Sequence, residues 1–365
     1  MLLVQEFLHS HTLAELDEKY HIHARRHGEF PNLVQLKYDQ IESPMGEPIV
    51  QQCRGIILDE ADGWRVVAYP MGKFFNAEEG HAAPIDWATA VVQEKVDGSL
   101  ILLYHYRDGL RVATSGMPDA AGDVNGLGLS FSKLFWDAWS ESGWRLPADR
   151  DYTYMFELTS PWNRVVVPHA GTSLHALAMR NRDTGEEVAI AGSPLSAYNP
   201  VRSFPLQTLE DVVKTFDTFS PLQQEGYVVV DAAFHRIKVK HPGYVAIHHL
   251  KDGFGPRRMV ELIRIGESSE VMTYFPEWKE PFEQTQVVYD GIVAGVLADY
   301  ERLKDIPSQK DFALEAVKTK CSAALFQMRA KRITSPKEMF AKMPIRSLMQ
   351  LLGLRDTEDA DDEPA

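Results

Sequence analysis

The stretch at residues 94–100, Glu-Lys-Val-Asp-Gly-Ser-Leu, places Lys95 between two carboxylates and follows it with a glycine and an apolar run. A solvent-exposed turn before a hairpin has the same composition, so the heptapeptide alone leaves two interpretations open. For Lys95 to act as a nucleophile, its amine must be partly deprotonated. Burial and nearby cations favour the neutral amine, and flanking carboxylates oppose it. The chemical interpretation therefore requires further cations close to Lys95 in space.

A second stretch, Ile237-Lys238-Val239-Lys240, supplies two such cations. Side chains alternate along a β-strand, so two lysines that are two residues apart point to the same face. The alternative is an ordinary solvated strand face. If this face meets Lys95, the two lysines would also bind a triphosphate through charge-assisted hydrogen bonds, which are stronger than hydrogen bonds between neutral groups.

Two carboxylates stand in strand-like surroundings. Glu157 lies within Phe156-Glu157-Leu158, and Glu225 comes directly before Gly226-Tyr227-Val228-Val229. Acidic residues at strand ends are commonly turn residues, and that alternative remains open for both. A carboxylate beside a glycine can also hold a ribose hydroxyl or a divalent metal, since magnesium takes oxygen ligands and shares them with phosphate.

Taken in order, these motifs resemble the motif series of the covalent nucleotidyltransferases, which are the DNA ligases, the RNA ligases and the mRNA capping enzymes. The series is Lys-x-Asp-Gly, Phe-Glu, Glu-Gly-Tyr-Val and Lys-x-Lys, and the resemblance covers about residues 38–245. Longer segments are similar to the tRNA-repairing phage RNA ligases: Gln-Cys-Arg-Gly-Ile-Ile at 52–57, Pro-Met-Gly-Lys-Phe-Phe-Asn at 70–76, the run at 156–166, and Lys-His-Pro-Gly-Tyr-Val at 240–245. Beyond about residue 270 the resemblance is faint.

The resemblance implies a role for each matching residue. It implies a catalytic set of Lys95, Asp97, Lys238 and Lys240 and an ATP-binding set of Tyr38, Arg54, Lys73, Phe75, Gly98, Glu157, Glu225, Lys238 and Lys240. Lys95 would take AMP from ATP and release pyrophosphate, while the paired lysines stabilise charge on the phosphates. Magnesium, or manganese in its place, would be the metal, with Glu225 as its ligand. For Tyr38 and Phe75 the alternative is an ordinary aromatic core position.

One segment departs from the resembled family. That family usually carries a basic residue before a glycine after the nucleophile strand, and here Ser115 stands in that place, within Ala-Thr-Ser-Gly at 113–116. A phosphate contact is then either missing or supplied by Arg111.

The pattern of apolar residues predicts an α+β protein. Short runs rich in Val, Ile and Tyr, such as 55–59, 100–104 and 226–230, predict β-strands, with one helix at about 128–142. After about residue 245 the period becomes helical, with helices expected from Thr285, over 308–332 and within 335–353. The pattern thus predicts a mixed body at 1–245, an all-α domain at 246–353, and an acidic disordered tail at 354–365. The resemblance implies that the body is an antiparallel-sheet nucleotidyltransferase domain, ATP-grasp-like as in ligases.

Bulk properties narrow the class further. The net charge is −14, which argues against a protein that coats nucleic acid through overall positive charge. Two cysteines, Cys53 and Cys321, cannot form a disulfide framework. We see no signal peptide and no apolar run near the ~20 residues that span a bilayer. A reducing cytoplasm, bacterial or that of a phage-infected host, is the expected location, without membrane association.

The expected function is ATP-dependent joining of RNA ends that carry a 5′-phosphate and a 3′-hydroxyl, by a monomer, with nicked tRNA as a candidate substrate. The lysines and arginines of the helical C-terminal part can contact RNA phosphates and so position the RNA; a solvated helix face is the alternative. The resemblance implies that this part is concerned with the choice of RNA. Two other functions stay open. A DNA ligase or capping-type enzyme would carry an OB-fold after Lys240, and a non-catalytic RNA-end-binding protein would lack the nucleophile or the paired lysines.

Overall fold

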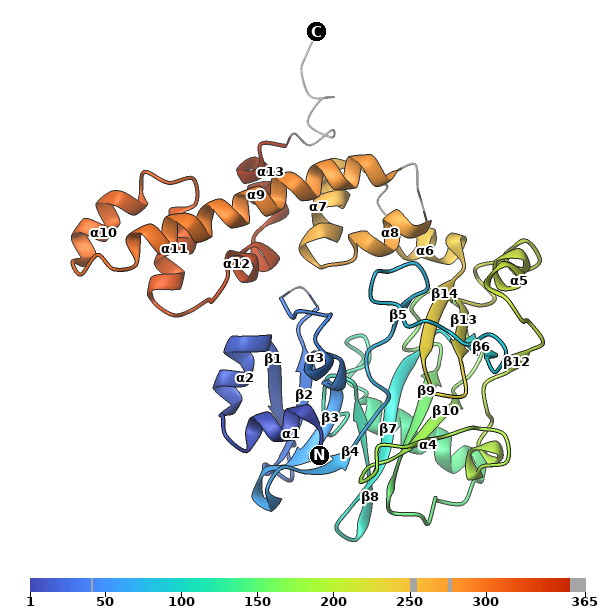
Figure 1. Ribbon diagram of the computed structural model, residues 1–365. Helices are drawn as coiled ribbons and strands as arrows, with labels where there is room; N and C mark the ends of the chain where they lie inside the picture. Colours follow the sequence, from blue (N-terminus) through green and yellow to red (C-terminus); the bar gives the residue numbers. More distant parts are fainter. Residues whose placement is uncertain (41, 250–254, 275–277, 355–365) are drawn as a thin grey trace. The chain divides into compact units, whose positions relative to one another are not determined.

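A computed structural model describes residues 1–40, 42–249, 255–274 and 278–354 (Figure 1). Its contacts divide the chain into two units. The first holds Met1–Asp39 and Ser43–His248, and the second holds Gln40, Glu42 and the described residues from His249 onward. The predicted domain boundary at residue 245 falls inside helix α6 (Pro242–His249), and the acidic tail predicted from residue 354 lies outside the described residues except for Leu354.

The first unit contains the strands of the described chain. They are β1 (Ile22–Arg26), β2 (Leu33–Tyr38), β3 (Arg54–Asp59), β4 (Arg65–Ala68), β5 (Phe75–Asn76), β6 (Val91–Lys95), β7 (Ser99–Tyr106), β8 (Gly109–Thr114), β9 (Tyr152–Thr159), β10 (Ser173–Asn181), β11 (Glu187–Val188), β12 (Ser203–Phe204), β13 (Gly226–Val230) and β14 (Arg236–Lys240). Its helices are α1 (Leu3–Leu8), α2 (Leu13–Tyr20), α3 (Pro48–Gln52), α4 (Phe131–Ser142), α5 (Leu209–Lys214) and α6, with 3₁₀ turns at Glu60–Asp62, Pro194–Ala197 and Thr215–Asp217.

The strands form three sheets, ordered β1-β2-β3-β4, β11-β10-β9-β7-β8 and β12-β6-β13-β14-β5. The ladder between β14 and β5 is parallel, and the other ladders are antiparallel. Together with the helices of the second unit, these sheets confirm the predicted α+β class with antiparallel sheets.

Layered packing explains why the strand at 100–104 is apolar without alternation. Its even-numbered residues Leu102 and Tyr104 pack with Ile57 and Val67 of the first sheet. Its odd-numbered residues Ile101 and Leu103 face the opposite way and pack against α4. A strand that is buried on both faces carries apolar residues at every position. Figure 1 shows α4 against this sheet.

The third sheet has two unlike faces. Val92, Tyr227, Val229, Ile237 and Val239 pack together with Val212 of α5 in one apolar cluster. Because neighbouring side chains on a strand alternate, the opposite face is formed by the residues between them. That face therefore carries the end of β6 and the two lysines of β14.

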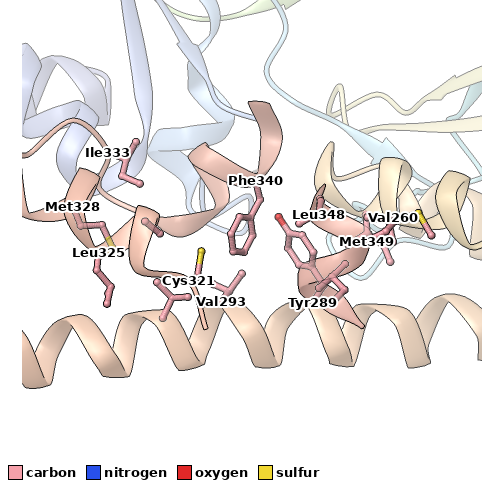
Figure 2. Packing of buried hydrophobic residues seen from close by; sticks show 14 of the residues in the cluster. Val260, Tyr289, Val293, Cys321, Leu325, Met328, Ile333, Phe340, Leu348 and Met349 are labelled. Carbon is pink, nitrogen blue, oxygen red and sulfur yellow. The ribbon is translucent and has the colours of Figure 1, made fainter. Parts of the chain in front are cut away.

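The second unit is helical in its described part. Its helices are α7 (Pro256–Arg264), α8 (Ser268–Tyr274), α9 (Lys279–Leu303), α10 (Gln309–Ala316), α11 (Ser322–Arg329), α12 (Pro336–Lys342) and α13 (Ile345–Leu352). Phe340, Tyr289, Val293, Leu325 and Leu348 belong to its apolar core, which gathers along α9 (Figure 2). Among the described residues, no helix has both the length and the apolar character that a membrane span requires.

Two details of the predicted helices are wrong. Thr285 is not an N-cap: α9 begins at Lys279, and the Thr285 hydroxyl donates to the Pro281 carbonyl inside the helix at 2.8 Å. The helix predicted over 308–332 is two helices, α10 and α11. Between them the Thr319 hydroxyl donates to the Ala316 carbonyl at 2.7 Å, a local bond that competes with helix continuation.

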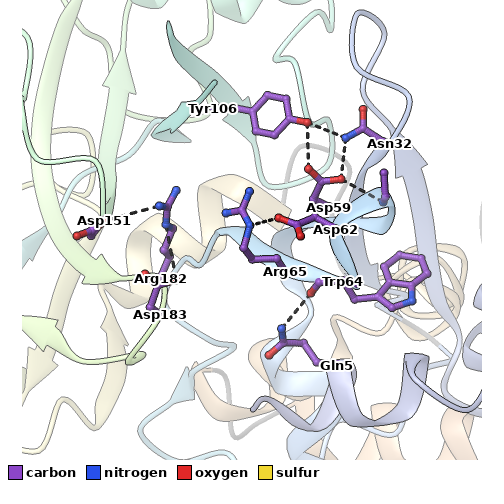
Figure 3. A network of polar contacts seen from close by, with 12 residues as sticks. Gln5, Asn32, Asp59, Asp62, Trp64, Arg65, Tyr106, Asp151, Arg182 and Asp183 are labelled. Carbon is purple, nitrogen blue, oxygen red and sulfur yellow. Dashed lines mark hydrogen bonds and ion pairs between the residues drawn. The ribbon is translucent and has the colours of Figure 1, made fainter. Parts of the chain in front are cut away.

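A polar network holds the β3–β4 connection in the first unit (Figure 3). Asp59, the last residue of β3, accepts hydrogen bonds from the Tyr106 hydroxyl at 3.0 Å and from the Asn32 amide at 2.7 Å. Tyr106 ends β7, so this buried carboxylate links two sheets. In the β7–β8 hairpin, Tyr106 pairs with Gly109 and Arg107 adopts a φ of 52°. Arg107 and Asp108 are therefore the turn residues of this hairpin.

Candidate active site

Lys95 is the last residue of β6, which pairs with β13, and β13 pairs in turn with β14. Gly226 of β13 pairs with Lys95 on one side and with Lys240 of β14 on the other. Three adjacent strands therefore bring the predicted nucleophile and one of the predicted phosphate lysines to either side of a single glycine.

Glu225 joins these two lysines. The Lys95 Nζ lies 2.6 Å from Glu225 Oε2, and the Lys240 Nζ lies 3.5 Å from Glu225 Oε1. The Glu225 side chain is 5% exposed, against 22% for Lys95 and 14% for Lys240. Burial of a carboxylate is favourable only when it is paired, and here one carboxylate is shared between two ammonium groups that the sequence separates by 145 positions.

Gly226 is required for this close arrangement. A Cβ at this position would lie 2.3 Å from the Val239 carbonyl oxygen and 2.7 Å from the Lys240 Cα. The residue also has a φ of 151°, in the region that favours glycine. The glycine in the predicted Glu-Gly-Tyr-Val motif therefore has a steric reason.

The two lysines of β14 share one face, as the alternation predicts. Ile237 and Val239 are buried in the cluster beneath the third sheet, and Lys238 and Lys240 lie between them on the opposite face. The Lys238 Nζ is 5.9 Å from the centre of the Phe74 ring. The face thus carries Lys95, Lys238 and Lys240 together, which the sequence interpretation required.

Asp97 has contacts that are structural. Its Oδ2 accepts hydrogen bonds from the backbone N–H groups of Val166 and Val167, at 2.9 and 2.7 Å. Its Oδ1 accepts from the Tyr244 hydroxyl at 2.8 Å. The carboxylate ties the loop after Lys95 to a distant loop and to helix α6, so its geometry is that of a positioning residue.

Gly98 allows a close approach on the same loop. A Cβ there would meet the Leu158 carbonyl oxygen at 2.4 Å and the Glu157 Cγ at 3.1 Å. The loop after the predicted nucleophile therefore lies directly on strand β9, which carries Glu157.

Glu157 lies in a site where its charge is disfavoured. Burial raises the pKa of its carboxyl group to about 8, and the nearby charges of Glu225 and Asp97 act in the same direction. Lys95 and Arg54 oppose the shift. These mutual effects place Glu157 among the other predicted site residues, although no hydrogen bond joins its side chain to any residue that the structure describes.

Arg54 is the first residue of β3, and its charge acts on the Glu157 carboxyl group. Its Nη1 is buried and has no hydrogen-bond partner among the described residues, and its guanidinium carbon lies 5.4 Å from the centre of the Phe74 ring. A buried guanidinium nitrogen without an acceptor is unfavourable, and it suits an anionic ligand.

The Lys73 Nζ lies between two aromatic rings, 5.3 Å from the centre of Tyr38 and 5.4 Å from that of Phe75. Tyr38 is 8% exposed and Phe75 is 5% exposed. Both rings are therefore core positions that also hold a predicted site lysine by cation–π contact.

The predicted metal ligand has both oxygens engaged. In the described part of the chain no group of three or more His, Cys, Asp or Glu side chains is placed to hold a metal. The Glu225 carboxylate supplies the kind of oxygen ligand that magnesium takes, since magnesium commonly binds one or two carboxylates.

Two residues near the site were not assigned a role from the sequence. Tyr244 belongs to the family-like segment at 240–245, and its hydroxyl anchors Asp97. Lys37, beside the predicted Tyr38, places its Nζ 3.4 Å from the Ser115 hydroxyl. The sequence carries no signal for that contact, because 78 positions separate the two residues.

Arg111 does not take the place of the basic residue that the family usually carries at Ser115. Its guanidinium carbon lies 5.0 Å from the centre of the Phe30 ring, and its Nη1 donates to the Leu110 carbonyl at 3.2 Å. Four residues along a strand correspond to about 13 Å. The alternative that Arg111 supplies the phosphate contact is therefore not supported.

The chain is similar to several known proteins. Among solved structures, an archaeal ATP-dependent RNA ligase is 12% identical with a TM-score of 0.43, covering 87% of this chain and 77% of that chain. A Naegleria gruberi RNA ligase, solved with ATP and Mn, is 14% identical with a TM-score of 0.33, covering 44% of this chain and 51% of that one.

Two curated relatives are more similar in sequence. The RNA ligase of Rhodothermus phage RM378 is 26% identical, with 58% of this chain covered. A putative bifunctional polynucleotide kinase/RNA ligase of Autographa californica nuclear polyhedrosis virus is 27% identical, with 76% covered. The chain spans 63% and 42% of the lengths of these relatives, less than two thirds of each.

A family model described as RNA ligase matches residues 52–244, just over half of the chain. The matched region begins before Arg54 and ends at Tyr244, so it contains the Lys95–Glu225–Lys240 arrangement. The match confirms the resemblance that the motifs indicated. The chain therefore belongs to the RNA ligase family.

Proposed function

We propose that this protein is an ATP-dependent RNA ligase that carries AMP on Lys95 and joins RNA 5′-phosphate ends to 3′-hydroxyl ends. The observation that carries the proposal is the shared ion pair of Glu225 with Lys95 and Lys240. A lysine nucleophile, a carboxylate at hydrogen-bond distance and a second lysine are the groups that nucleotidyl transfer to an amine requires.

In the first step the Lys95 amine attacks the α-phosphorus of ATP. An N–P bond forms, the bond from the α-phosphorus to the bridging oxygen breaks, and pyrophosphate leaves. Glu225 Oε2, at 2.6 Å, is the acceptor nearest to the Lys95 ammonium group and takes its proton. Such a transfer depends mainly on in-line positioning and on neutralising phosphate charge.

Several other side chains hold the nucleotide. Lys238 and Lys240 stabilise the charge on the α-phosphate and the leaving group, and Arg54 and Lys73 bind the phosphate end. Glu157 binds the ribose hydroxyls, and because its pKa is raised to about 8 its carboxyl group can donate as well as accept. A magnesium ion, or manganese in its place, would neutralise phosphate charge when bound at Glu225.

The adenylyl group then passes from Lys95 to an RNA 5′-phosphate oxygen, which restores the amine and forms a phosphoanhydride. The RNA 3′-hydroxyl attacks the adenylylated phosphorus, a phosphodiester forms, and AMP leaves. The helical second unit is proposed to choose the RNA, with a nicked tRNA as the candidate substrate. Some of its cations already pair with carboxylates on the same helix or turn, such as Arg258 with Glu261 at 3.1 Å and Lys318 with Glu315 at 2.5 Å. RNA phosphates would compete with those carboxylates.

The decisive experiment is incubation of the whole protein with α-labelled ATP or GTP and magnesium, followed by denaturation. We expect label from ATP to remain on the protein, and Lys95→Ala to abolish it. Lys133→Ala, which removes an exposed lysine of α4 paired with Asp137, is the matched control and should keep the label.

Addition of strands with 5′-phosphates then identifies the acceptor. Joining of RNA supports the proposal, whereas joining of DNA alone, or label from GTP alone, would indicate the DNA ligase or capping alternative. Absence of any adduct with intact binding of RNA ends would indicate a non-catalytic relative.

A further inference from the structure

Lys37 lies at the phosphate end of the proposed site, and no carboxylate of the described residues pairs with it. It stands near the end of β2, opposite Arg54 on β3, and its Nζ lies 3.4 Å from the Ser115 hydroxyl. A Cβ on Gly116 would be 3.4 Å from the same Nζ. The ammonium group therefore sits at the segment where the chain departs from its family.

A β-bulge creates this meeting of three distant segments. The pairing of β2 with β3 passes from Leu36–Ile56 to Lys37–Arg54 and so skips Gly55. Gly55 has a φ of 97°, and a Cβ there would lie 3.1 Å from the Ser115 backbone. The bulge thus sets Arg54 opposite Lys37 and lets the turn that carries Ser115 pack on β3.

The surroundings of Lys37 are cationic. Burial lowers the pKa of its ammonium group, and Arg54, Arg25 and Lys73 lower it further. Within the part of the chain that the structure describes, no ion pair to a carboxylate is formed by Lys37, Arg54 or Lys73. Partly buried cations gathered without an anion are unfavourable, and the orphaned Nη1 of Arg54 belongs to the same group. Lys37, Arg54 and Lys73 together therefore form a cationic cluster that could bind a polyanion such as a chain of phosphates.

We propose that Lys37 is a phosphate-binding residue of this site, which supplies from β2 the positive charge that Ser115 does not supply from the end of β8. The inference rests on the proposed function, because it takes the ligand to be a phosphate of the joining reaction. Two ligands have that chemistry, the pyrophosphate end of ATP and the 5′-phosphate of the RNA.

The test compares four whole-chain variants with the wild type. Lys37→Met removes the charge and keeps the length of the side chain, and Lys37→Arg keeps the charge. Lys37→Met/Ser115→Lys returns a charge from the other strand. Lys133→Met removes an exposed lysine elsewhere in the first unit. Calorimetry measures binding of inorganic pyrophosphate, and a second titration compares an RNA oligonucleotide with a 5′-phosphate and the same oligonucleotide with a 5′-hydroxyl.

We expect Lys37→Met to weaken pyrophosphate binding, or the preference for the 5′-phosphate, by about 10- to 100-fold, as for loss of one charge-assisted contact. The titration that changes identifies the phosphate. Lys37→Arg and Lys133→Met should bind as the wild type does, and the double variant should recover most of the loss. Unchanged binding of both ligands in Lys37→Met overturns the proposal. If the double variant binds no better than Lys37→Met, a lysine at position 115 does not replace the charge of Lys37, and that part of the proposal is overturned.

Neither titration needs catalysis, so this inference and the proposed function fail separately. A wild type that forms no adduct with ATP but loses pyrophosphate binding through Lys37→Met contradicts only the proposed function. Misfolding is checked by thermal unfolding. Because Lys37→Met removes a partly buried cation from among other cations, its melting temperature without ligand should equal or exceed that of the wild type.

Discussion

At the scale of single residues, Glu157 is a carboxyl group of the proposed site whose ionised form is disfavoured by burial. Its pKa is raised from 4.5 to about 8, chiefly by burial. Between these two values the unfolded chain has ionised this carboxyl group and the folded protein has not. Folding then binds a proton, so the stability must fall as the pH rises through this window and level off above about pH 8.

Glu157→Gln should remove this dependence. The amide cannot ionise, so the free energy of unfolding should decline less between pH 5 and pH 8, by roughly 1–3 kcal/mol compared with the wild type. Urea unfolding at a series of pH values measures it. Glu141→Gln, at an exposed position of α4, is the control and should keep the wild-type slope; equal slopes in Glu157→Gln and wild type would contradict the assignment.

Individual site residues differed in how far the sequence could predict them. Lys95, Glu225 and Lys240 stand in motifs, and the structure brings them together. Lys37 could not be found, because its neighbourhood depends on a bulge at Gly55 and on a turn that is remote in the chain. Asp97 was expected to be catalytic from its motif, but its oxygens bind backbone N–H groups and the Tyr244 hydroxyl.

At the scale of elements, β13 is the centre of the site because it separates β6 from β14 at one glycine. Gly226→Ala should push these strands apart, since the added methyl group would overlap the Val239 carbonyl. We expect a loss of stability of roughly 2–4 kcal/mol and slower formation of the Lys95 adduct. Denaturant unfolding and single-turnover labelling measure the two effects.

Gly80→Ala is the matched control for that variant, because a Cβ at Gly80 meets nothing within 4 Å. It should leave stability and labelling close to those of the wild type. If Gly226→Ala also left both unchanged, the close approach of the three strands would not matter for the site.

Elements were predicted well where burial alone decides them and poorly where local bonds do. Apolar strands such as 100–104 and 226–230 are present as β7 and β13. On α9, Val288 is 38% exposed, whereas Tyr289 and Val293 are buried in the core of the second unit. Between α10 and α11 the Thr319 hydroxyl donates to the Ala316 carbonyl, a contact that no periodic pattern contains.

At the scale of the whole molecule, the proposed site residues all lie in the first unit, which has apolar cores of its own. A chain that ends at His249 should therefore fold and still form the ATP-dependent adduct, since a unit with its own core can fold alone. RNA joining should fall more than adduct formation. Circular dichroism and labelling test this, and a folded fragment that takes no label would contradict the assignment of the site to this unit.

The helical character after residue 245 was predictable from the periodicity, because amphipathic helices leave a clear pattern. The predicted acidic tail lies outside the described residues apart from Leu354. Gln40 and Glu42 are grouped with the second unit because of their contacts, although they are remote from it in the sequence. The sequence could not predict that grouping.

The contact of Lys37 with Ser115 has a consequence for comparing relatives. Two ammonium groups at that distance would repel each other, so one position should be basic when the other is small and neutral. A column-by-column alignment would record this chain as having lost a ligand at position 115. A comparison by location in space would record the same charge, carried by β2 of one sheet and not by the segment after β8 of another.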